Sequence, residues 1–423
     1  MPTLGLMLWT QTIALAVASE GSASAVPTLA GVPVAFLLFA ATLIGVAVLH
    51  HRTLEVGLTG LVAIGLFQTT LGGLDGWAHL AHEGVLLANL FGLLLGFALL
   101  ADHFERSGLP EALPAYLPDD WRGGLALLGL VFALATFLDS IAAAIIGATI
   151  ARAVYDGRVH LGFLAAIVGA ANAGGAGSVL GNTPTTMMWI AGIAPLTIAP
   201  AFLGAAVVLL VSGIAAARQQ HAHAPIQRDA DTSVPFDAGR LGVVAIQLGA
   251  AVGTNVLINL YAPEHTDGFP WLGGALLIAT LATAGWRRPN WTLLPEAAKG
   301  AVFLLSLVLS ASMMPVAALP EPSWLTALGL GFVSAVFDNI PLTALAIHQD
   351  GYDWALLAMS VGCGGSMIWF GSSAGVAIAA IHPEARNTLA WVRAGWHVWA
   401  GFVAGFAVMV LVLGWNPHPI AGG

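Results

Sequence analysis

Phe-Leu-Asp-Ser-Ile at residues 137–141 and Val-Phe-Asp-Asn-Ile at residues 336–340 are the two stretches that decide the fold of this chain. Each of them places an aspartate in the middle of a long apolar run. Downstream of each aspartate, the glycine-rich stretches also agree: Gly-Gly at 174–175 with Gly-Gly at 364–365, and Gly-Asn-Thr at 181–183 with Gly-Ser-Ser at 371–373. Interrupted apolar segments that recur at matching places are typical of internal repeats in membrane transport proteins.

The composition around these stretches is that of a membrane protein. Of the 423 residues, 58% are hydrophobic and only 8% are charged, whereas a soluble domain carries about 25% charged residues. The apolar runs are continuous, which favours helices over the alternating strands of a membrane barrel. The net charge of −9 excludes the basic surface that nucleic-acid binding requires. The sequence therefore predicts an all-α polytopic membrane protein with two inverted repeats, each with a re-entrant hairpin and a broken helix.

The expected organisation follows from the order of the apolar segments. A short signal-like or first apolar segment precedes the first repeat, a hydrophilic cytoplasmic linker separates the two repeats, and a tail follows the second, inverted repeat. The predicted boundaries are 1–25, 27–215, 216–240, 241–414 and 415–423.

The distribution of basic residues predicts the topology. Lys and Arg concentrate in cytoplasmic loops of membrane proteins. If both aspartate-containing segments are re-entrant hairpins, all 13 Lys and Arg residues fall on the cytoplasmic side. The hairpin with Asp139 then enters from the cytoplasm and the hairpin with Asp338 enters from outside.

Polar residues inside the apolar runs are the candidate site. A charged residue at a helix centre costs about 2.5–3.5 kcal/mol on insertion scales, so its presence indicates a hydrated cavity, a bound cation or protonation. Capping of a restarted helix is the alternative role for the two aspartates, and the two roles are compatible. The predicted transport and ion-binding residues are Asp139, Ser140, Asn172, Asn182, Thr183, Thr185, Thr186, Asp338, Asn339, Thr343, Ser372 and Ser373.

The first break is expected around Pro184, because proline cannot donate a backbone hydrogen bond. The oxygens of Asn182 and of the threonines beside it suit a hard cation, or hydrogen bonds to a polar solute. Asn89 and Gln247 are interpreted as interhelical hydrogen-bond partners. His79 and His82 are expected in an outer loop beside Glu83, and no transition-metal site is predicted.

The two aspartate tips and the stretch Ala-Asn-Ala-Gly-Gly, continued by Gly-Asn-Thr-Pro-Thr-Thr-Met-Met-Trp-Ile at 181–190, resemble the ion transporter superfamily. Within it, the chain resembles NhaD-type sodium/proton antiporters and related proteins labelled citrate or arsenite transporters. The resemblance implies two inverted repeats, a homodimer and elevator-like movement. It matches Asp139 and Asp338 to the hairpin tips, and Thr183, Thr185, Thr186, Ser372 and Ser373 to the polar breaks.

The chain departs from this pattern at two positions. NhaD-type antiporters typically have Asp where this chain has Asn182, and Asn where it has Ser140. Dicarboxylate carriers of the superfamily have Ser-Asn-Thr at the tips, which suits an anion, whereas this chain has an aspartate there. Two carboxylates repel an anionic substrate unless cations or protons intervene.

The main hypothesis is therefore a proton-coupled monovalent-cation antiporter of the inner cell membrane, in which Asp139 and Asp338 line one shared chamber. It needs no cofactor, and its coupling ions are H⁺ and possibly Na⁺. The alternative is an Na⁺- or H⁺-coupled carboxylate or oxyanion transporter. A remote alternative is an intramembrane aspartyl protease, but the chain lacks the Gly-x-Gly-Asp motif of such enzymes.

Overall fold

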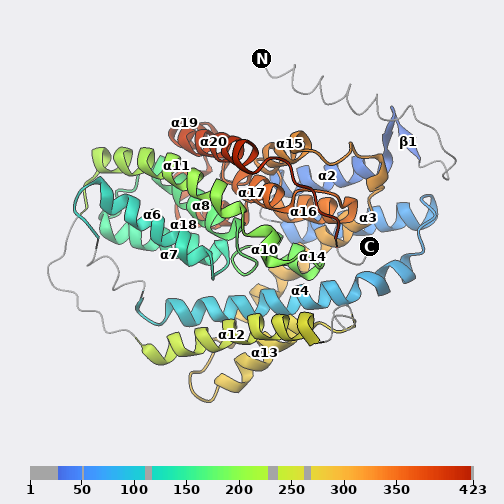
Figure 1. Cartoon of the computed structure of the whole chain (residues 1–423), viewed down its shortest axis with the longest axis horizontal. Coiled ribbons are helices and arrows are strands. Elements are labelled where there is room, and N and C mark those ends of the chain that lie inside the picture. The colour runs from blue at the N-terminus through green and yellow to red at the C-terminus, as the bar shows by residue number, and fades with distance from the viewer. Residues whose placement is uncertain (1–26, 50–51, 110–116, 227–236, 262–267, 421–423) are drawn as a thin grey trace.

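The protein is an assembly of helices in which strands are almost absent (Figure 1). A computed structural model describes residues 27–49, 52–109, 117–226, 237–261 and 268–420. Within these ranges, the strands are two short segments paired antiparallel near the start, β1 (Thr28–Leu29) and β2 (Val32–Pro33). The prediction of an all-α polytopic membrane protein is confirmed.

The helices of the first half follow the predicted order of plain, interrupted and closing segments. They are α2 (Val34–Val48), α3 (Thr53–Thr70), α4 (Gly76–Glu105), α6 (Trp121–Ala135), α7 (Ser140–Val154), α8 (Leu161–Ala176), α9 (Thr183–Ile190), α10 (Pro195–Ile198) and α11 (Ala201–His223).

The helices of the second half repeat this order. They are α12 (Ala238–Tyr261), α13 (Trp271–Thr283), α14 (Leu294–Ser312), α15 (Trp324–Ser334), α16 (Asn339–Gln349), α17 (Trp354–Gly364), α18 (Ser373–Ile381), α19 (Thr388–Ala394) and α20 (Trp396–Leu413), with three short 3₁₀ turns η3 (Trp291–Leu293), η4 (Val316–Ala318) and η5 (Pro383–Arg386).

Five of the described helices are long and apolar enough to cross a membrane. An apolar helix of about 20 residues spans the hydrocarbon core of a bilayer. The five spans are Thr53–Thr70, Gly76–Glu105, Ala201–His223, Trp291–Ser312 and Trp396–Leu413. The shorter apolar helices include both halves of the first predicted hairpin and the first half of each predicted broken helix.

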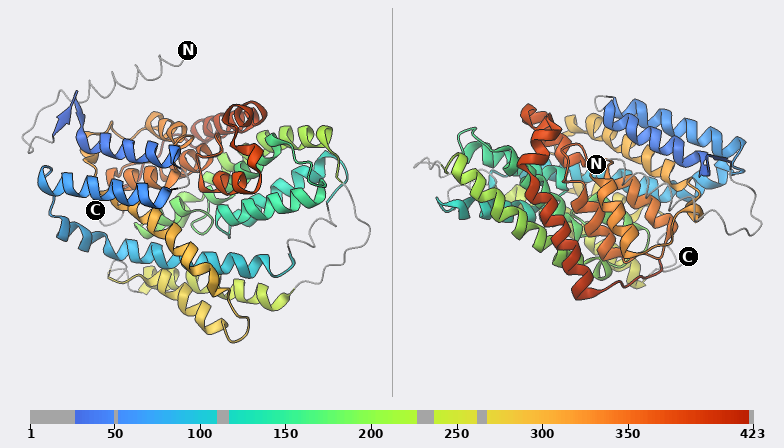
Figure 2. Two further views of the ribbon diagram at one scale, coloured as in Figure 1. Left: turned by 180° about the vertical axis from the view of Figure 1, so that it is seen from behind. Right: turned by 90° about the horizontal axis from the view of Figure 1, so that it is seen from above.

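Corresponding helices of the two halves make corresponding contacts (Figure 2). Helix α2 packs on α3 as α12 packs on α13, and α6 packs on α8 as α15 packs on α17. Contacts between the halves are also paired, because α4 packs on α13 as α14 packs on α3, and α7 packs on α18 as α16 packs on α9. The inverted orientation of the repeats in a membrane stays a prediction.

The interruptions lie where the sequence places helix-capping residues. Asp139 is the N-cap of α7 and Asp338 is the N-cap of α16, and each side chain accepts a hydrogen bond from the backbone. Such capping satisfies one of the unpaired N–H groups at a helix start. The first broken helix is interrupted at 177–182, just before Pro184. Pro184 lies in the first turn of α9, where its missing N–H leaves no hydrogen bond unmade.

Two boundaries differ from the prediction. Helix α11 continues to His223, so residues 216–223 of the predicted linker are helical. Helix α4 begins at Gly76, because the Asp75 side chain caps its first turn. His79 and His82 therefore lie in helix α4, and the expectation of an outer loop at these residues is wrong. The predicted segment 1–25 lies outside the described residues.

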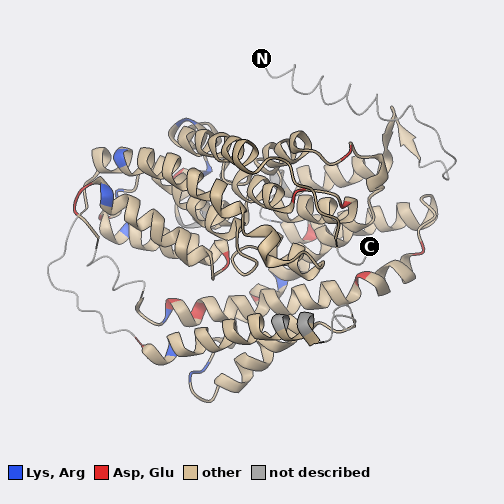
Figure 3. Cartoon of the chain, viewed as in Figure 1, with Lys and Arg blue, Asp and Glu red and all other residues tan. Residues whose placement is uncertain are grey.

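Charged side chains are unevenly distributed over the described part of the molecule. In the view of Figure 3, Lys and Arg lie in the left half and centre, and the right-hand edge carries Asp and Glu. The single cysteine, Cys363, is buried in α17.

The C-terminal segment lies across the turn between α16 and α17. The Asn416 amide donates to Asp353 Oδ2 over 3.0 Å, and the Ile420 amide donates to Asp350 Oδ1 over 3.0 Å. The Trp354 indole donates to the His418 carbonyl over 2.7 Å. The His418 amide also donates to the Tyr352 carbonyl over 3.1 Å, so this strap, residues 416–420, is held by four hydrogen bonds to the turn.

Candidate functional site

Asp139 lies at the turn between α6 and α7. Its Oδ2 accepts a hydrogen bond from the Ile141 amide at 3.1 Å. The carboxylate is half-buried and lines a pocket between helix α4 and the first break. The other lining residues are Leu90, Leu93, Leu94, Phe97, Leu180, Asn182, Thr183 and Thr186. Three candidate residues from the first break therefore share one pocket with Asp139.

Asp338 occupies the matching position between α15 and α16. Its Oδ1 accepts from the Ile340 amide at 3.0 Å, and its Oδ2 accepts from the Ser373 hydroxyl at 2.9 Å. The carboxylate lines a second pocket, together with Ser373 and apolar side chains of α2, α14 and α18. Ser373 is the first residue of α18, so the hairpin tip and the second break meet at this hydrogen bond.

The two aspartates line separate pockets. No described residue belongs to the lining of both pockets. The wall opposite Asp139 comes from α4, whereas the wall opposite Asp338 comes from α2 and α14. The two pockets are thus lined by different residues, and the expectation of one shared chamber stays a prediction.

The hydroxyl groups of the first break are engaged to different degrees. Thr185 Oγ1 donates to the Ser178 carbonyl at 2.6 Å, and Thr186 Oγ1 donates to the Val179 carbonyl at 2.8 Å. These two threonines hold the non-helical segment against the first turn of α9. Thr183 is also buried, but its hydroxyl has no hydrogen-bond partner among the described residues.

The remaining candidates are buried near the tips and breaks. Ser140 and Asn339 directly follow the two aspartates, and Thr343 Oγ1 donates to the Asn339 carbonyl within α16 at 2.9 Å. Asn172 in α8 donates to two hydroxyl groups of the second break. The structure thus gathers the predicted residues around two tips and two breaks.

No protein-family model matches the chain. The chain is similar to two curated proteins of Arabidopsis thaliana. Sodium/proton antiporter 1 is 29% identical over 322 residues, which are 68% of this chain and 55% of that protein. Sodium/proton antiporter 2 is 29% identical over 316 residues, which are 66% of this chain and 74% of that protein. The chain thus matches about half the length of the first relative.

Both of these relatives are named sodium/proton antiporters. Their names agree with a site made of carboxylates and hydroxyl groups in a bundle of apolar helices. The NhaD-type assignment stays a prediction.

Two polar residues of the membrane-spanning helices have the predicted interhelical role. Asn89 Oδ1 in α4 accepts from the Gly273 amide in α13 at 2.7 Å. Gln247 Nε2 in α12 donates to Thr280 Oγ1 in α13 at 3.2 Å. Both side chains therefore join neighbouring helices.

Sequence reasoning missed one residue of the second break and the burial of a glutamate elsewhere on α4. Ser366, in the second break, accepts a hydrogen bond from Asn172. Glu83 is buried on α4, and its Oε1 lies 4.0 Å from His348 Nε2 at the end of α16. Ser366 follows the Gly-Gly pair that marks the second break, which is a signal that could have found it. Glu83 gave no such signal, because it stands at the edge of its apolar run.

Proposed function

We propose that this protein is a secondary transporter that exchanges protons for a monovalent cation, most simply Na⁺, across the inner cell membrane. The observation that carries the proposal is the Asp139 pocket, in which a carboxylate faces amide and hydroxyl groups of a helix break. The similarity to two proteins named sodium/proton antiporters supports the same function.

The proposed mechanism is competition at a carboxylate. A proton and a cation cannot both neutralise Asp139 at the same time, so binding of one releases the other. Oxygen atoms of Asn182 and Thr183 line the same pocket and suit a hard cation such as Na⁺. Exchange across the membrane results when this pocket faces the two sides in turn.

The proposed architecture is a pair of inverted repeats that move as an elevator within a homodimer. The paired helix contacts and the one-sided distribution of Lys and Arg support the inverted repeats. The homodimer and the elevator movement follow from the resemblance to the ion transporter superfamily.

The test is exchange in everted vesicles and in proteoliposomes with an imposed pH gradient. The wild-type protein should dissipate the gradient on addition of Na⁺ or Li⁺, with K⁺ as the comparison. Uptake of radiolabelled citrate or succinate without cation exchange would instead establish the carboxylate transporter.

Asp139→Asn should abolish exchange while the protein is still inserted in the membrane. Asparagine caps helices about as well as aspartate, so the start of α7 is preserved while the charge is lost. Asp75→Asn is the matched control, because Asp75 caps α4 with an exposed side chain outside the site. Unchanged cation-induced dequenching in Asp139→Asn would refute the assignment.

A further inference from the structure

Asn172 joins the first half of the chain to the second break. Its side chain is fully buried in α8. Its Nδ2 donates to Ser366 Oγ at 2.9 Å and to Ser372 Oγ at 3.0 Å. Both serines belong to the segment between α17 and α18. A helix of the first half therefore fixes the second break through both amide hydrogens of one side chain.

One of the residues that Asn172 contacts, Ser372, lies next to the hydrogen-bond donor of one of the two aspartates, Asp338. Ser372 is the N-cap of α18 and accepts from the Gly375 amide, and Ser373 begins the helix. The Ser373 hydroxyl donates to Asp338 Oδ2, while the Ile340 amide donates to Asp338 Oδ1. Both carboxylate oxygens of Asp338 thus have a donor, and one donor stands next to a residue that Asn172 holds.

Asp139 has a different environment. Its hydrogen bonds come from the backbone of its own hairpin tip, and no side chain of the described residues donates to it. Thr183 stands where the second half has Ser373, but its hydroxyl does not bond to Asp139 in the described structure. Asn182, at the position of Ser372, has its Nδ2 buried without a partner.

The difference between the two breaks arises at residue 362, the counterpart of Asn172. Counting back two residues from each Gly-Gly pair aligns Asn172 with Gly362. Gly362 has no side chain with which to hold the first break. A Cβ atom added at Gly362 would lie 3.6 Å from Asn182 Nδ2, at ordinary contact distance. We call the two hydrogen bonds from Asn172 to Ser366 and Ser372 the clamp of the second break. The first break has no equivalent side chain at position 362 and therefore lacks such a clamp.

We infer that the two aspartates have different roles in the proposed exchange. Asn172 is a positioning residue that holds Ser372, Ser373 and, through them, the carboxylate of Asp338. Asp139 keeps an oxygen without a side-chain donor, in a pocket with Thr183, and is the carboxylate that exchanges proton and cation. Charge-assisted hydrogen bonds such as that of Ser373 are stronger than neutral ones, so they fix Asp338 in one geometry.

The clamp itself can be tested without transport, by thermal unfolding of the purified protein in detergent. Asn172→Ala and Ser372→Ala should each lower Tm, and the double variant should lower it by less than the sum of the two shifts, since the bond they share can be lost only once while the Ser372 cap of α18 is lost separately. Asn172→Ala combined with Thr183→Ala is the control, whose shifts should add. Additive shifts for Asn172 and Ser372 would overturn the clamp.

A substitution that adds a hydrogen-bonding group at Gly362 tests the inference independently. Gly362→Ser places a hydroxyl group near the unpartnered Asn182 amide, and Gly362→Ala adds only the Cβ atom. Gly362→Ser should have a higher Tm than Gly362→Ala. An equal or lower Tm would contradict the proposed cause of the difference between the two breaks.

The division of roles rests on the proposed function and is tested by the cation dependence of exchange. Asp139→Asn should abolish exchange. Asp338→Asn, Ser373→Ala and Asn172→Ala should raise the half-maximal Na⁺ concentration by about tenfold, with the maximal rate retained. In the Asn172→Ala Ser373→Ala double variant, the half-maximal Na⁺ concentration should rise by less than the product of the two single increases. Ser366→Ala should raise the half-maximal Na⁺ concentration by a smaller factor.

These experiments distinguish a failure of the proposed function from a failure of the inferred division of roles between the two aspartates. If the wild-type protein exchanges no monovalent cation, the proposed function fails while the Tm cycle still reports the clamp. If exchange occurs but Asp338→Asn is as inactive as Asp139→Asn, the two aspartates are equivalent and the inference is wrong.

Discussion

Single residues explain why the tips and breaks form where they do. Both aspartates cap a restarting helix, and Pro184 lies where a proline is tolerated. These features were predictable because capping and proline geometry depend on neighbouring residues. The bond between Asn172 and Ser366 was not predictable, because it joins residues 194 positions apart. Whether the two carboxylates share a pocket also depends on such long-range packing.

Asp237 is the residue at which pH dependence of stability is expected. It lies just outside the membrane-spanning helices and accepts hydrogen bonds from Arg287, 2.9 Å from Nε to Oδ2 and 3.1 Å from Nη2 to Oδ1. These bonds lower the pKa of Asp237. A carboxyl with a lowered folded pKa stabilises the protein above its unfolded pKa, about 3.9 for Asp, and loses this effect as pH falls through the folded value.

Asp237→Asn should therefore lower Tm at pH 7, and this difference from wild type should shrink as the pH falls below about 3.9. The measurement is Tm against pH in detergent. Glu55→Gln is the control, because the pair of Glu55 with Arg52 is exposed and 3.9 Å long, and such pairs contribute little. A constant difference between Asp237→Asn and wild type over the whole pH range would show that the charge is irrelevant.

At the scale of elements, the close approach of helices depends on glycine. Helices α4 and α13 cross where Gly92 meets Gly273. A Cβ atom at Gly273 would lie 2.6 Å from the Asn89 carbonyl oxygen and 3.0 Å from Gly92 Cα. Small residues at such crossings let membrane helices pack backbone to backbone. The 51 glycines of the sequence favour such packing but do not indicate which helices it joins.

Gly273→Ala should accordingly destabilise the protein by about 1–3 kcal/mol, the usual cost of overpacking. Its neighbour Gly274 offers a matched substitution, because a Cβ atom there meets only Phe269, at 3.6 Å. Gly274→Ala should be neutral or slightly stabilising, since alanine favours helix over glycine. Thermal unfolding in detergent compares the two variants, and equal Tm values would count against the backbone contact.

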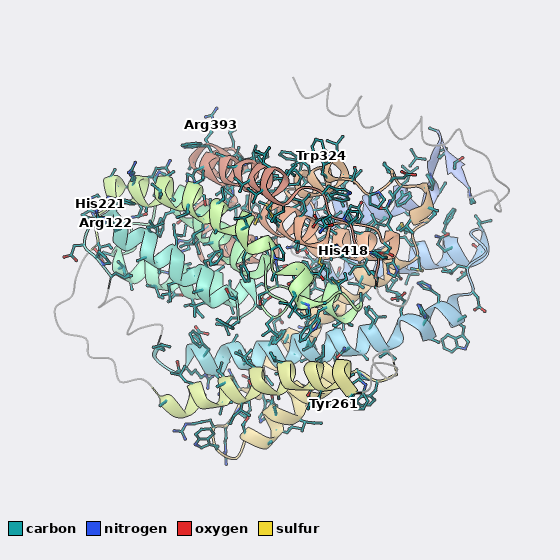
Figure 4. The ribbon with its side chains drawn as sticks, viewed as in Figure 1. Arg122, His221, Tyr261, Trp324, Arg393 and His418 are labelled. Atoms are coloured by element: carbon teal, nitrogen blue, oxygen red, sulfur yellow. The ribbon has the colours of Figure 1, made fainter. Side chains whose placement is uncertain are left out.

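At the scale of the whole molecule, the order of the helices was predictable and their orientation in the membrane is still to be measured. The apolar runs and their interruptions fixed the order of elements, because hydrophobicity along the chain reflects membrane insertion. Figure 4 shows Arg122 and His221 at one end of the bundle, and Tyr261 well away from them. The charge pattern predicts that His221 faces the cytoplasm and Tyr261 the outside.

Thiol labelling tests this topology. Both side chains are exposed, whereas the thiol of Cys363 is buried, so the unsubstituted protein is the unlabelled control. A membrane-impermeant maleimide should label His221→Cys in everted vesicles and Tyr261→Cys in right-side-out cells. Labelling of each from the side opposite to that predicted would mean that the segment with Asp139 crosses the membrane completely, because both positions follow it in the chain. Labelling of both from the same side would mean that α12 does not cross.

The strap formed by residues 416–420 bears on how the protein is handled in the laboratory. Its hydrogen bonds to Asp350, Asp353 and Trp354 join the chain end to the turn that precedes the second broken helix. Removal of residues 416–420, or a fused segment that displaces them, takes these hydrogen bonds away from the turn. A spacer that leaves the strap in place keeps a tag or fluorescent reporter from disturbing α16 and α17.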